Sequence, residues 1–335
     1  MIISDKQELR RCVKQLVRRA DVCEASLSFD MEKGETGVMA MLDAWARPGV
    51  TPSESLSRTT AEQSPFSPDA AAMFAALDAM DLPVRDLDRA ANQQREYDRD
   101  SYLRELLDTL RAKCVLVHVP MDRAGDVRFD DERVMPLLDV DASLFVPGRY
   151  GVHYQGAAAA IAESAAMLGA RNIALERFDD QALRYCLMPL CEDQGFALHV
   201  RVASAEEAQR LAQLLDGFGG VRVLAIAKSA NAQRELIEAA KTRTRMLVCL
   251  AAVDGMAEAL AQLGTRFVPF SADATLAEMM LGRWVLAKEQ IWQALCDAYL
   301  PLARSGYPLE SAAIERDVRN LLSGNLLALC CPEEI

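Results

Sequence analysis

The sequence predicts an α/β fold built on a parallel sheet, and two observations carry this prediction. From about residue 110 onward, short apolar segments alternate with helical patterns at the spacing of repeated strand–helix units. Lys113 to Asp122 (KCVLVHVPMD) is a continuous apolar run followed by Pro120 and Asp122, as expected of a parallel strand that is buried on both faces. Periodicity alone fits an open doubly wound sheet and a closed barrel equally well.

The individual elements follow from apolar spacing and from glycine, proline and capping residues. The N-terminal segment is a basic amphipathic helix, because Leu9, Val13, Leu16 and Val17 recur at helical spacing. The remaining elements are expected in this order: a first strand at 21–29; an irregular stretch at 30–70 with a helix at 39–45; helices at 64–79 and 102–110; strands at 113–122 and 133–141; a helix at 155–168 closed by Gly169; a strand at 172–176; a helix at 181–195; a strand at 196–203; a helix at 205–215; a strand at 221–227; a helix at 233–241; a strand at 246–250; a helix at 256–263; a strand at 265–270; and helices at 277–289 and 309–329.

Size and charge exclude several classes of function. A chain of 335 residues can bury a large core, as one barrel or as two ordinary domains. A net charge of −12 argues against nucleic acid or an anionic membrane as the main partner. No apolar run approaches the roughly 20 residues of a membrane span, and the N-terminus lacks the apolar core of a signal peptide. The nine cysteines include no CxxC pair, which argues against a zinc ribbon or a disulfide frame and favours the reducing cytoplasm.

The segment Leu263 to Glu289 reads as strand, turn and helix, and it contains the first candidate for catalysis. Asp273 follows the apolar run Thr265 to Phe270, at the point where a buried strand reaches the surface. Barrel enzymes hold catalytic groups at the carboxyl ends of their strands. An aspartate in this position also caps helices, so its place in the sequence alone leaves both roles open.

The same segment resembles the last strand of the uronate (glucuronate) isomerase family, within the amidohydrolase superfamily of metal-dependent barrels. The resemblance rests on these residues: Gly264, Thr265, Arg266, Phe267, Pro269, Phe270, Ser271, Asp273, Leu281, Gly282, Arg283, Trp284, Ala287 and Lys288. It implies a single distorted (βα)8 TIM-type barrel over residues 1–335, with a helical insertion or lid at 30–110 after the first strand. In that family the aspartate after the final strand sits at the metal and moves protons, and Asp273 matches it.

Several residues that the resemblance requires for chemistry are different in this chain. The family's first strand reads roughly V-V-D-x-H-x-H-L-F, and its two metal-binding histidines fall on Ala25 and Leu27, or on Ser26 and Ser28 if the register shifts by one. Neither register restores a ligand, and we expect Ala25 or Leu27 to face Asp273. Asp139 replaces an arginine that would pair with a sugar carboxylate, and the strand at 221–227 with Ala230 lacks a polar catalytic group.

The remaining candidates for ligand contacts are the three histidines and two neighbours of one of them. His118 and His199 lie in apolar strands, where a histidine of the core or of the barrel lining is expected, although an inward side chain at the mouth would line a pocket. His153 follows Arg149 and Tyr150 in a segment that we expect to be a loop. There Arg149 offers a bidentate fork for a carboxylate and Tyr150 offers a hydroxyl.

Three functions remain open from the sequence. The favoured hypothesis is a cytoplasmic pseudoenzyme of this fold, without cofactor or metal and with zinc disfavoured, that binds a small carboxylate or sugar acid. The second is an active aldose–ketose isomerase of hexuronates, or a related hydrolase, which uses Asp273 as its base with help from His118 or His199. The third is a structural or partner-binding subunit. A homo-oligomer is compatible with all three.

Overall fold

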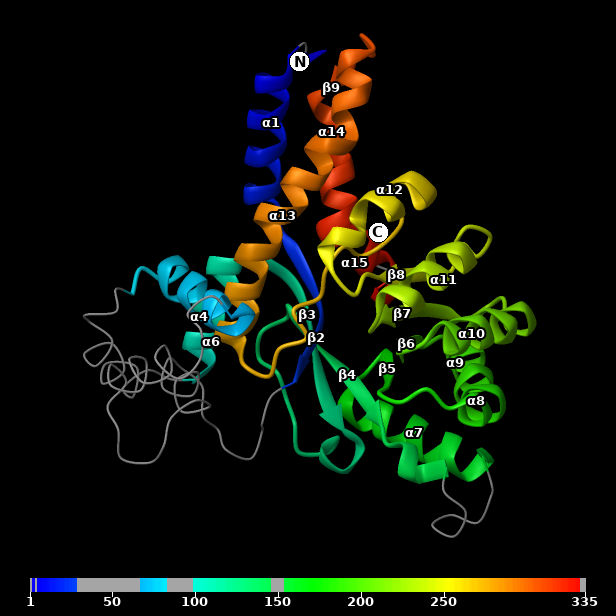
Figure 1. The fold of residues 1–335 in the computed structure, drawn as a ribbon. Helices are drawn as coiled ribbons and strands as arrows, with labels where there is room; N and C mark the ends of the chain where they lie inside the picture. Colours follow the sequence, from blue (N-terminus) through cyan, green and yellow to red (C-terminus); the bar gives the residue numbers. More distant parts are fainter. Residues whose placement is uncertain (1, 4, 29–66, 83–98, 146–153, 332–335) are drawn as a thin grey trace.

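A curled sheet of parallel strands forms the centre of the molecule (Figure 1). The computed structural model describes residues 2–3, 5–28, 67–82, 99–145 and 154–331. The described sheet has seven strands, which pair in the order of the chain: β2 (Val22–Ser28), β3 (Ala112–Pro120), β4 (Val134–Val140), β5 (Asn172–Leu175), β6 (Ala197–Val202), β7 (Arg222–Ala227) and β8 (Met246–Cys249). Sequential parallel pairing with helices between the strands is the arrangement of a TIM-type barrel, as the sequence predicted.

An irregular segment at 268–274 closes the ring between the two edge strands. Val268 forms a parallel bridge with Cys249 of β8, and Ala274 forms one with Leu27 of β2. The amide of Ser28 also donates a hydrogen bond of 2.9 Å to the carbonyl of Ala274. The prediction of a regular strand at 265–270 is therefore wrong, because this closing segment makes single bridges instead of a continuous ladder.

The helices match most of the sequence predictions. The longer α-helices are α1 (Lys6–Arg19), α4 (Pro68–Ala79), α6 (Arg99–Leu110), α7 (Tyr154–Leu168), α10 (Ala205–Gly217), α11 (Ala230–Ala240), α12 (Met256–Leu263), α13 (Ala277–Arg304) and α14 (Ser311–Arg319). The segment 180–194 is helical and contains a π-turn. Gly169 and Gly195 end their helices with positive φ angles of 69° and 72°, a conformation that glycine adopts without strain.

Two helix predictions need correction. The helix predicted at 277–289 continues to Arg304, past Pro301. The helix predicted at 309–329 begins at Ser311, because Leu309 and Glu310 form β9, which pairs with β1 (Ile2–Ile3). It then passes through a π-turn into α15 (Asn325–Cys330). The predicted helix at 39–45 and most of the predicted insertion at 30–110 lie outside the described residues, so a lid over the mouth stays a prediction.

Hydrophobic residues form two cores, one on each side of the sheet. Alternation along β3 sends Val115 and Val117 into the core between sheet and helices, and Cys114 and Leu116 into the barrel interior. The inner core also contains Leu326, Leu329, Cys330 and Cys331 of the C-terminal segment, which packs into the barrel. All nine cysteines are free thiols, and Cys330 and Cys331 are buried, as expected of a packed tail.

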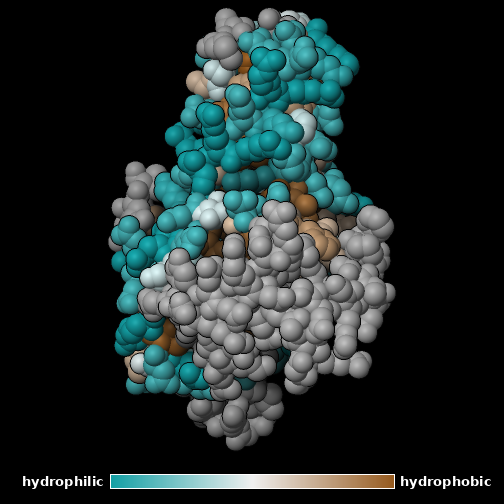
Figure 2. Space-filling view, turned by 90° about the vertical axis from the view of Figure 1, so that its left-hand side faces the viewer, coloured by the Kyte–Doolittle hydropathy of each residue, from teal (hydrophilic) through white to brown (hydrophobic). Residues whose placement is uncertain are grey.

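Helices α1, α13 and α14 project together from the barrel (Figure 1). Since α1 leads directly into β2, they project from the end of the barrel that holds the amino ends of the strands. In the view of Figure 2 their surface is mostly hydrophilic. Among the described residues, no helix has both the length and the apolar character needed to span a bilayer.

The buried carboxylate of Glu24 fastens the first strand to the closing segment and to α13. It accepts hydrogen bonds from the backbone amide of Ala272 (2.8 Å), the indole N–H of Trp284 (2.6 Å), the hydroxyl of Ser271 and the backbone amide of Ser26 (2.9 Å). Burial raises the pKa of the Glu24 carboxyl above its usual value, and these four hydrogen bonds oppose that shift. These contacts join β2, the closing segment and α13 at a point where no β-ladder connects them.

Replacing Glu24 by glutamine should weaken this connection. Three of the four groups that donate to Glu24 are N–H groups, which cannot accept a hydrogen bond. The NH2 group of a glutamine side chain in the same place would therefore face other donors and lack an acceptor. We expect the Glu24→Gln variant to lose about 1–3 kcal/mol of unfolding free energy in urea. Glu105→Gln, on the exposed face of α6, is the control and should change it by less than about 0.5 kcal/mol. Equal effects of the two substitutions would contradict this role.

Candidate functional site

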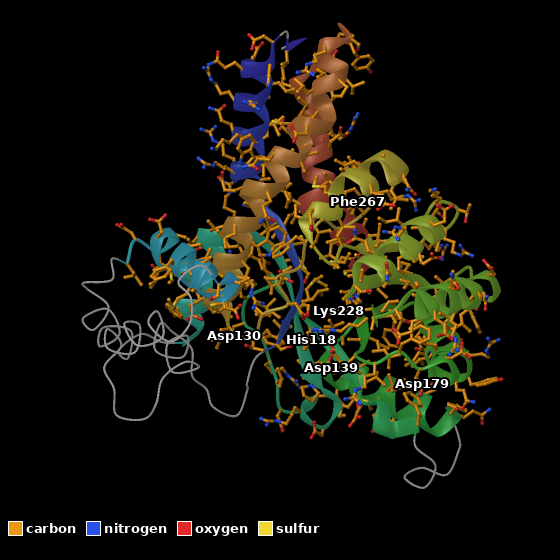
Figure 3. All side chains as sticks on the ribbon, viewed as in Figure 1. His118, Asp130, Asp139, Asp179, Lys228 and Phe267 are labelled. Atoms are coloured by element: carbon orange, nitrogen blue, oxygen red, sulfur yellow. The ribbon has the colours of Figure 1, made fainter. Side chains whose placement is uncertain are left out.

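Polar side chains gather where the parallel strands reach their carboxyl ends, and we call this group the mouth cluster. It consists of Ser26 from β2, His118 from β3, Asp139 from β4, Glu176 after β5, Arg201 from β6, Lys228 after β7 and Asp273 from the closing segment. Figure 3 shows His118, Asp139 and Lys228 at the same end of the barrel. Each of these residues lies at or just past the end of a buried strand, which is the position that barrel enzymes use for chemistry.

Asp273 lies at the centre of this cluster and is neutralised by two side-chain cations. The Arg201 guanidinium donates from Nη2 to Oδ1 at 2.6 Å and from Nη1 to Oδ2 at 3.2 Å. Lys228 Nζ donates to Oδ2 at 2.5 Å. The backbone of Asp273 has a φ of 46°, in the left-handed region, and Arg283 Nη1 donates to the carbonyls of Ala272 and Asp273. An unusual backbone conformation is thus held in place at the point where the cations meet.

The charge of Asp273 is stabilised strongly. Its partial burial raises the pKa, but the hydrogen bond from Lys228 and the positive charges of Arg201 and Lys228 outweigh burial and lower the pKa to about 2. A carboxylate with so low a pKa is a weak base, because efficient general bases have pKa values near the working pH. The surroundings of Asp273 therefore favour an electrostatic role over proton abstraction.

Ser26, and not Ala25 or Leu27, faces Asp273 from the first strand. The Ser26 hydroxyl donates to Asp273 Oδ1 at 2.9 Å. An irregularity in the pairing of β2 with β3, between Glu24 and Leu27, places one extra residue in β2. Ala25 consequently belongs to the inner core and Leu27 to the core under the helices. The expectation for Ala25 or Leu27 was wrong because sequence periodicity does not show the bulge.

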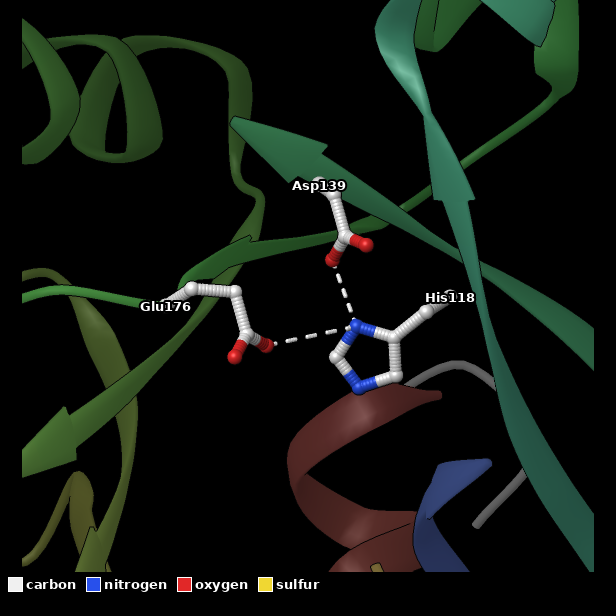
Figure 4. A group of neighbouring side chains, drawn as sticks. All are labelled: His118, Asp139 and Glu176. Atoms are coloured by element: carbon white, nitrogen blue, oxygen red, sulfur yellow. Dashed lines mark hydrogen bonds and ion pairs between the residues drawn. The ribbon is translucent and has the colours of Figure 1, made fainter. Parts of the chain in front are cut away.

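His118 connects the two sides of the mouth cluster. Its Nε2 lies 2.9 Å from the hydroxyl of Ser26. Its Nδ1 lies 2.5 Å from Asp139 Oδ1 and 3.6 Å from Glu176 Oε1, as Figure 4 shows. Glu176 Oε2 in turn lies 2.9 Å from Arg201 Nε. His118 is 5% exposed, whereas the Glu176 side chain is 42% exposed, so the imidazole forms part of the floor and the glutamate part of the rim.

His199 lies deeper in the barrel, two residues before Arg201 on the same strand. It is 1% exposed, and its Nε2 is 3.9 Å from Cys330 Sγ of the C-terminal helix. Burial, with a smaller contribution from His118, lowers the pKa of His199 to about 3, so the ring is neutral near pH 7. This environment is that of a core histidine. Arg149, Tyr150 and His153 lie outside the described residues, so their roles stay predictions.

Four charged residues of the mouth cluster were absent from the candidates predicted from sequence: Asp139, Glu176, Arg201 and Lys228. The expectation that Ala230 and the strand at 221–227 lack a polar catalytic group stays a prediction, although Lys228 follows that strand directly and contacts Asp273. A charged residue at the carboxyl end of each predicted buried strand is the signal that identifies all four.

The residues around Asp273 do not fit the divalent cation that the resemblance implies there. Histidines of the first strand are replaced by Ser26 at the position that contacts Asp273. The Arg201 Nη2 lies between the two, 3.1 Å from the Ser26 hydroxyl and 2.6 Å from Asp273 Oδ1. A guanidinium in this place would repel a cation, and Lys228 adds a second positive charge. The expectation that the protein binds no cofactor or metal covers the whole chain, and it stays a prediction.

The ion pairs of Asp273 make a prediction about the pH dependence of stability. The pKa of Asp273 is about 2 in the folded protein and about 4 in an unfolded chain, so its stabilising effect is complete above pH 4 and disappears as the pH falls towards 2. The difference in unfolding free energy between the wild type and Asp273→Asn should therefore be larger at pH 6 than at pH 3. Urea titrations at both pH values measure it, and a difference that does not change with pH would contradict this assignment.

Comparisons with known proteins support the fold. No family model matches the sequence, and no curated protein gives a significant match. Three solved structures are similar over nearly all of the chain: a uronate isomerase from Bacillus halodurans (TM-score 0.82, 15% identity, 98% of this chain and 97% of that chain covered), a uronate isomerase from Thermotoga maritima (0.65, 9%, 98% and 100%), and a proposed metal-dependent hydrolase from Lactobacillus casei (0.62, 12%, 96% and 98%). The chain therefore has the TIM-type barrel of the uronate isomerases, the family that its sequence resembles.

Proposed function

We propose that this barrel binds a small sugar acid or a related hydroxy acid in the mouth cluster and does not perform a metal-dependent isomerisation. One observation carries the proposal: the carboxylate of Asp273 is neutralised by Arg201 and Lys228. Side-chain cations thus supply the positive charge that a metal supplies in the family that the chain resembles. They cannot generate the low-pKa water or the strong Lewis acid that a divalent cation provides.

Lys228 is the group best placed to receive the carboxylate of such a ligand. Its side chain is 32% exposed, so it is accessible from the mouth. An ammonium carries three donors, and the contact with Asp273 uses one of them. Arg201 is less exposed, at 19%, and its contacts with Ser26, Asp273 and Glu176 hold the cationic side of the mouth in position.

The other side of the mouth offers acceptors for hydroxyl groups. Asp139 and Glu176 have side chains that are 25% and 42% exposed, and both point towards His118 (Figure 4). Ionised carboxylates are acceptors only, so they suit the O–H groups of a polyol. A ligand with a carboxylate at one end and hydroxyls at the other matches cations and acceptors that face each other across one mouth.

The alternative of an active hexuronate isomerase with Asp273 as base is less compatible with the charges. The Asp273 carboxylate has a pKa of about 2, so it is a poor acceptor for a proton from the substrate at neutral pH. Its two oxygens are also engaged by Arg201, Lys228 and Ser26. In our proposal Asp273 positions the two cations and takes no proton from the ligand.

Binding of D-glucuronate to the chelator-treated protein tests the proposal. We expect the ligand to raise the Tm of the wild type in a concentration-dependent way, because a ligand that binds only the folded state stabilises it. The rise should be lost in Lys228→Met and kept in Lys241→Met, in which the lysine of an exposed helical ion pair is replaced.

Two results would count against it. A Tm that D-glucuronate, D-galacturonate and D-gluconate all leave unchanged at millimolar concentration would argue against a site for sugar acids. Conversion of D-glucuronate to its ketose that is abolished by a chelator, restored by a divalent metal and lost in Asp273→Asn would establish the active isomerase in its place.

A further inference from the structure

We propose that His118, Asp139 and Glu176 form a binding site for one divalent transition-metal ion, on the side of the mouth away from the Lys228 ammonium and separate from the Asp273 position. Each residue directs one ligand atom to a common point: Nδ1 of the imidazole and one oxygen of each carboxylate lie within 4.8 Å of one another. The three side chains come from the ends of three neighbouring strands, β3, β4 and β5 (Figure 4).

The direction of the hydrogen bonds identifies which nitrogen of His118 carries a proton. Asp273 is ionised at neutral pH and accepts only, so the single hydroxyl proton of Ser26 is donated to Asp273 Oδ1. The Ser26 oxygen then acts as an acceptor for its two other neighbours, Arg201 Nη2 at 3.1 Å and His118 Nε2 at 2.9 Å. His118 therefore carries its proton on Nε2.

This assignment leaves Nδ1 with a lone pair directed at two carboxylates. Asp139 Oδ1 lies 2.5 Å away and Glu176 Oε1 lies 3.6 Å away. Three electron-rich atoms this close require a shared proton or a positive centre among them, and a metal ion meets this requirement. A neutral imidazole with two carboxylates is a donor set that divalent ions such as Mn²⁺, Co²⁺ and Zn²⁺ accept.

The neighbours of these three residues have the arrangement found around metal ligands. Histidines that bind metals usually donate their other N–H to a partner that fixes the ring, as Ser26 does here. Glu176 directs Oε1 towards His118, and its Oε2 forms an ion pair with Arg201 Nε at 2.9 Å. Since His118 is 5% exposed and the Glu176 side chain 42%, a bound ion would be held by the floor and open to the mouth.

The charge of the mouth cluster agrees with a cation in this place. Its three carboxylates, Asp139, Glu176 and Asp273, face the two cations Arg201 and Lys228, which leaves one surplus negative charge when His118 is neutral. One divalent ion would reverse this sign. The metal site does not depend on the proposed sugar acid, because it is defined by protein ligands alone.

Cobalt binding tests the site without any sugar. The full chain, stripped with a chelator and dialysed against Co²⁺ in excess Mg²⁺, should take up one Co²⁺ per chain and develop visible d–d absorption. Glu176→Gln, which replaces the most exposed ligand, should weaken Co²⁺ binding by at least about tenfold. Replacing a residue that only contacts a metal ligand already lowers metal affinity by that much. Glu206→Gln, in an exposed ion pair on α10, is the matched control and should leave binding unchanged.

Asp273→Asn separates this site from the position implied by the family resemblance. An asparagine oxygen can still accept from Ser26, so we expect Co²⁺ binding to persist in this variant. Loss of binding in Asp273→Asn together with full binding in Glu176→Gln would overturn the proposal in favour of the other position. Folded wild type that takes up no Co²⁺ would also overturn it. Neither result would decide whether the mouth binds sugar acids, which is measured on the chelator-treated protein.

Discussion

The buried carboxylate of Glu24 is the constraint on which the barrel and its mouth both depend. The closing segment has only single bridges to the strands beside it, so the ladder hydrogen bonds that hold the other strands are few there. Glu24 replaces them with bonds to Ser271, Ala272 and Trp284. Because Asp273 directly follows Ser271 and Ala272, the same contacts that close the ring set the place of the central carboxylate of the mouth.

From that fixed position, electrostatics organises the mouth cluster. Asp273 attracts Arg201 and Lys228, and the guanidinium occupies the space next to Ser26 where the resemblance implies a metal. Arg201 also reaches Glu176, which places a second carboxylate close to His118. The mouth is thereby divided into a cationic side and a side rich in acceptors. The cationic side suits the carboxylate of the proposed ligand. The acceptor-rich side suits its hydroxyls and contains the proposed cation site.

The sequence predicted the barrel and most helices because buried strands and amphipathic helices have clear periodicities, and family resemblance separated a barrel from an open sheet. It also identified Asp273, which lies in the closing segment. It could not predict that Ser26 faces Asp273, because the bulge in β2 leaves no mark in the apolar pattern. Arg201 and Lys228 were missed because reasoning from the family looked for histidines. Charged residues at strand ends were the available signal, and only the fold shows that they converge.

A crystal of the full chain grown with Mn²⁺ and measured for anomalous scattering tests the central claim most directly. The claim is that side-chain cations hold Asp273 and that any divalent ion lies between β3 and β5. We expect an anomalous peak within about 2.5 Å of His118 Nδ1 and of oxygens of Asp139 and Glu176, at distances typical of metal–ligand bonds, with Arg201 still bound to Asp273. A metal ion coordinated by Asp273, with Arg201 displaced from it, would contradict the account.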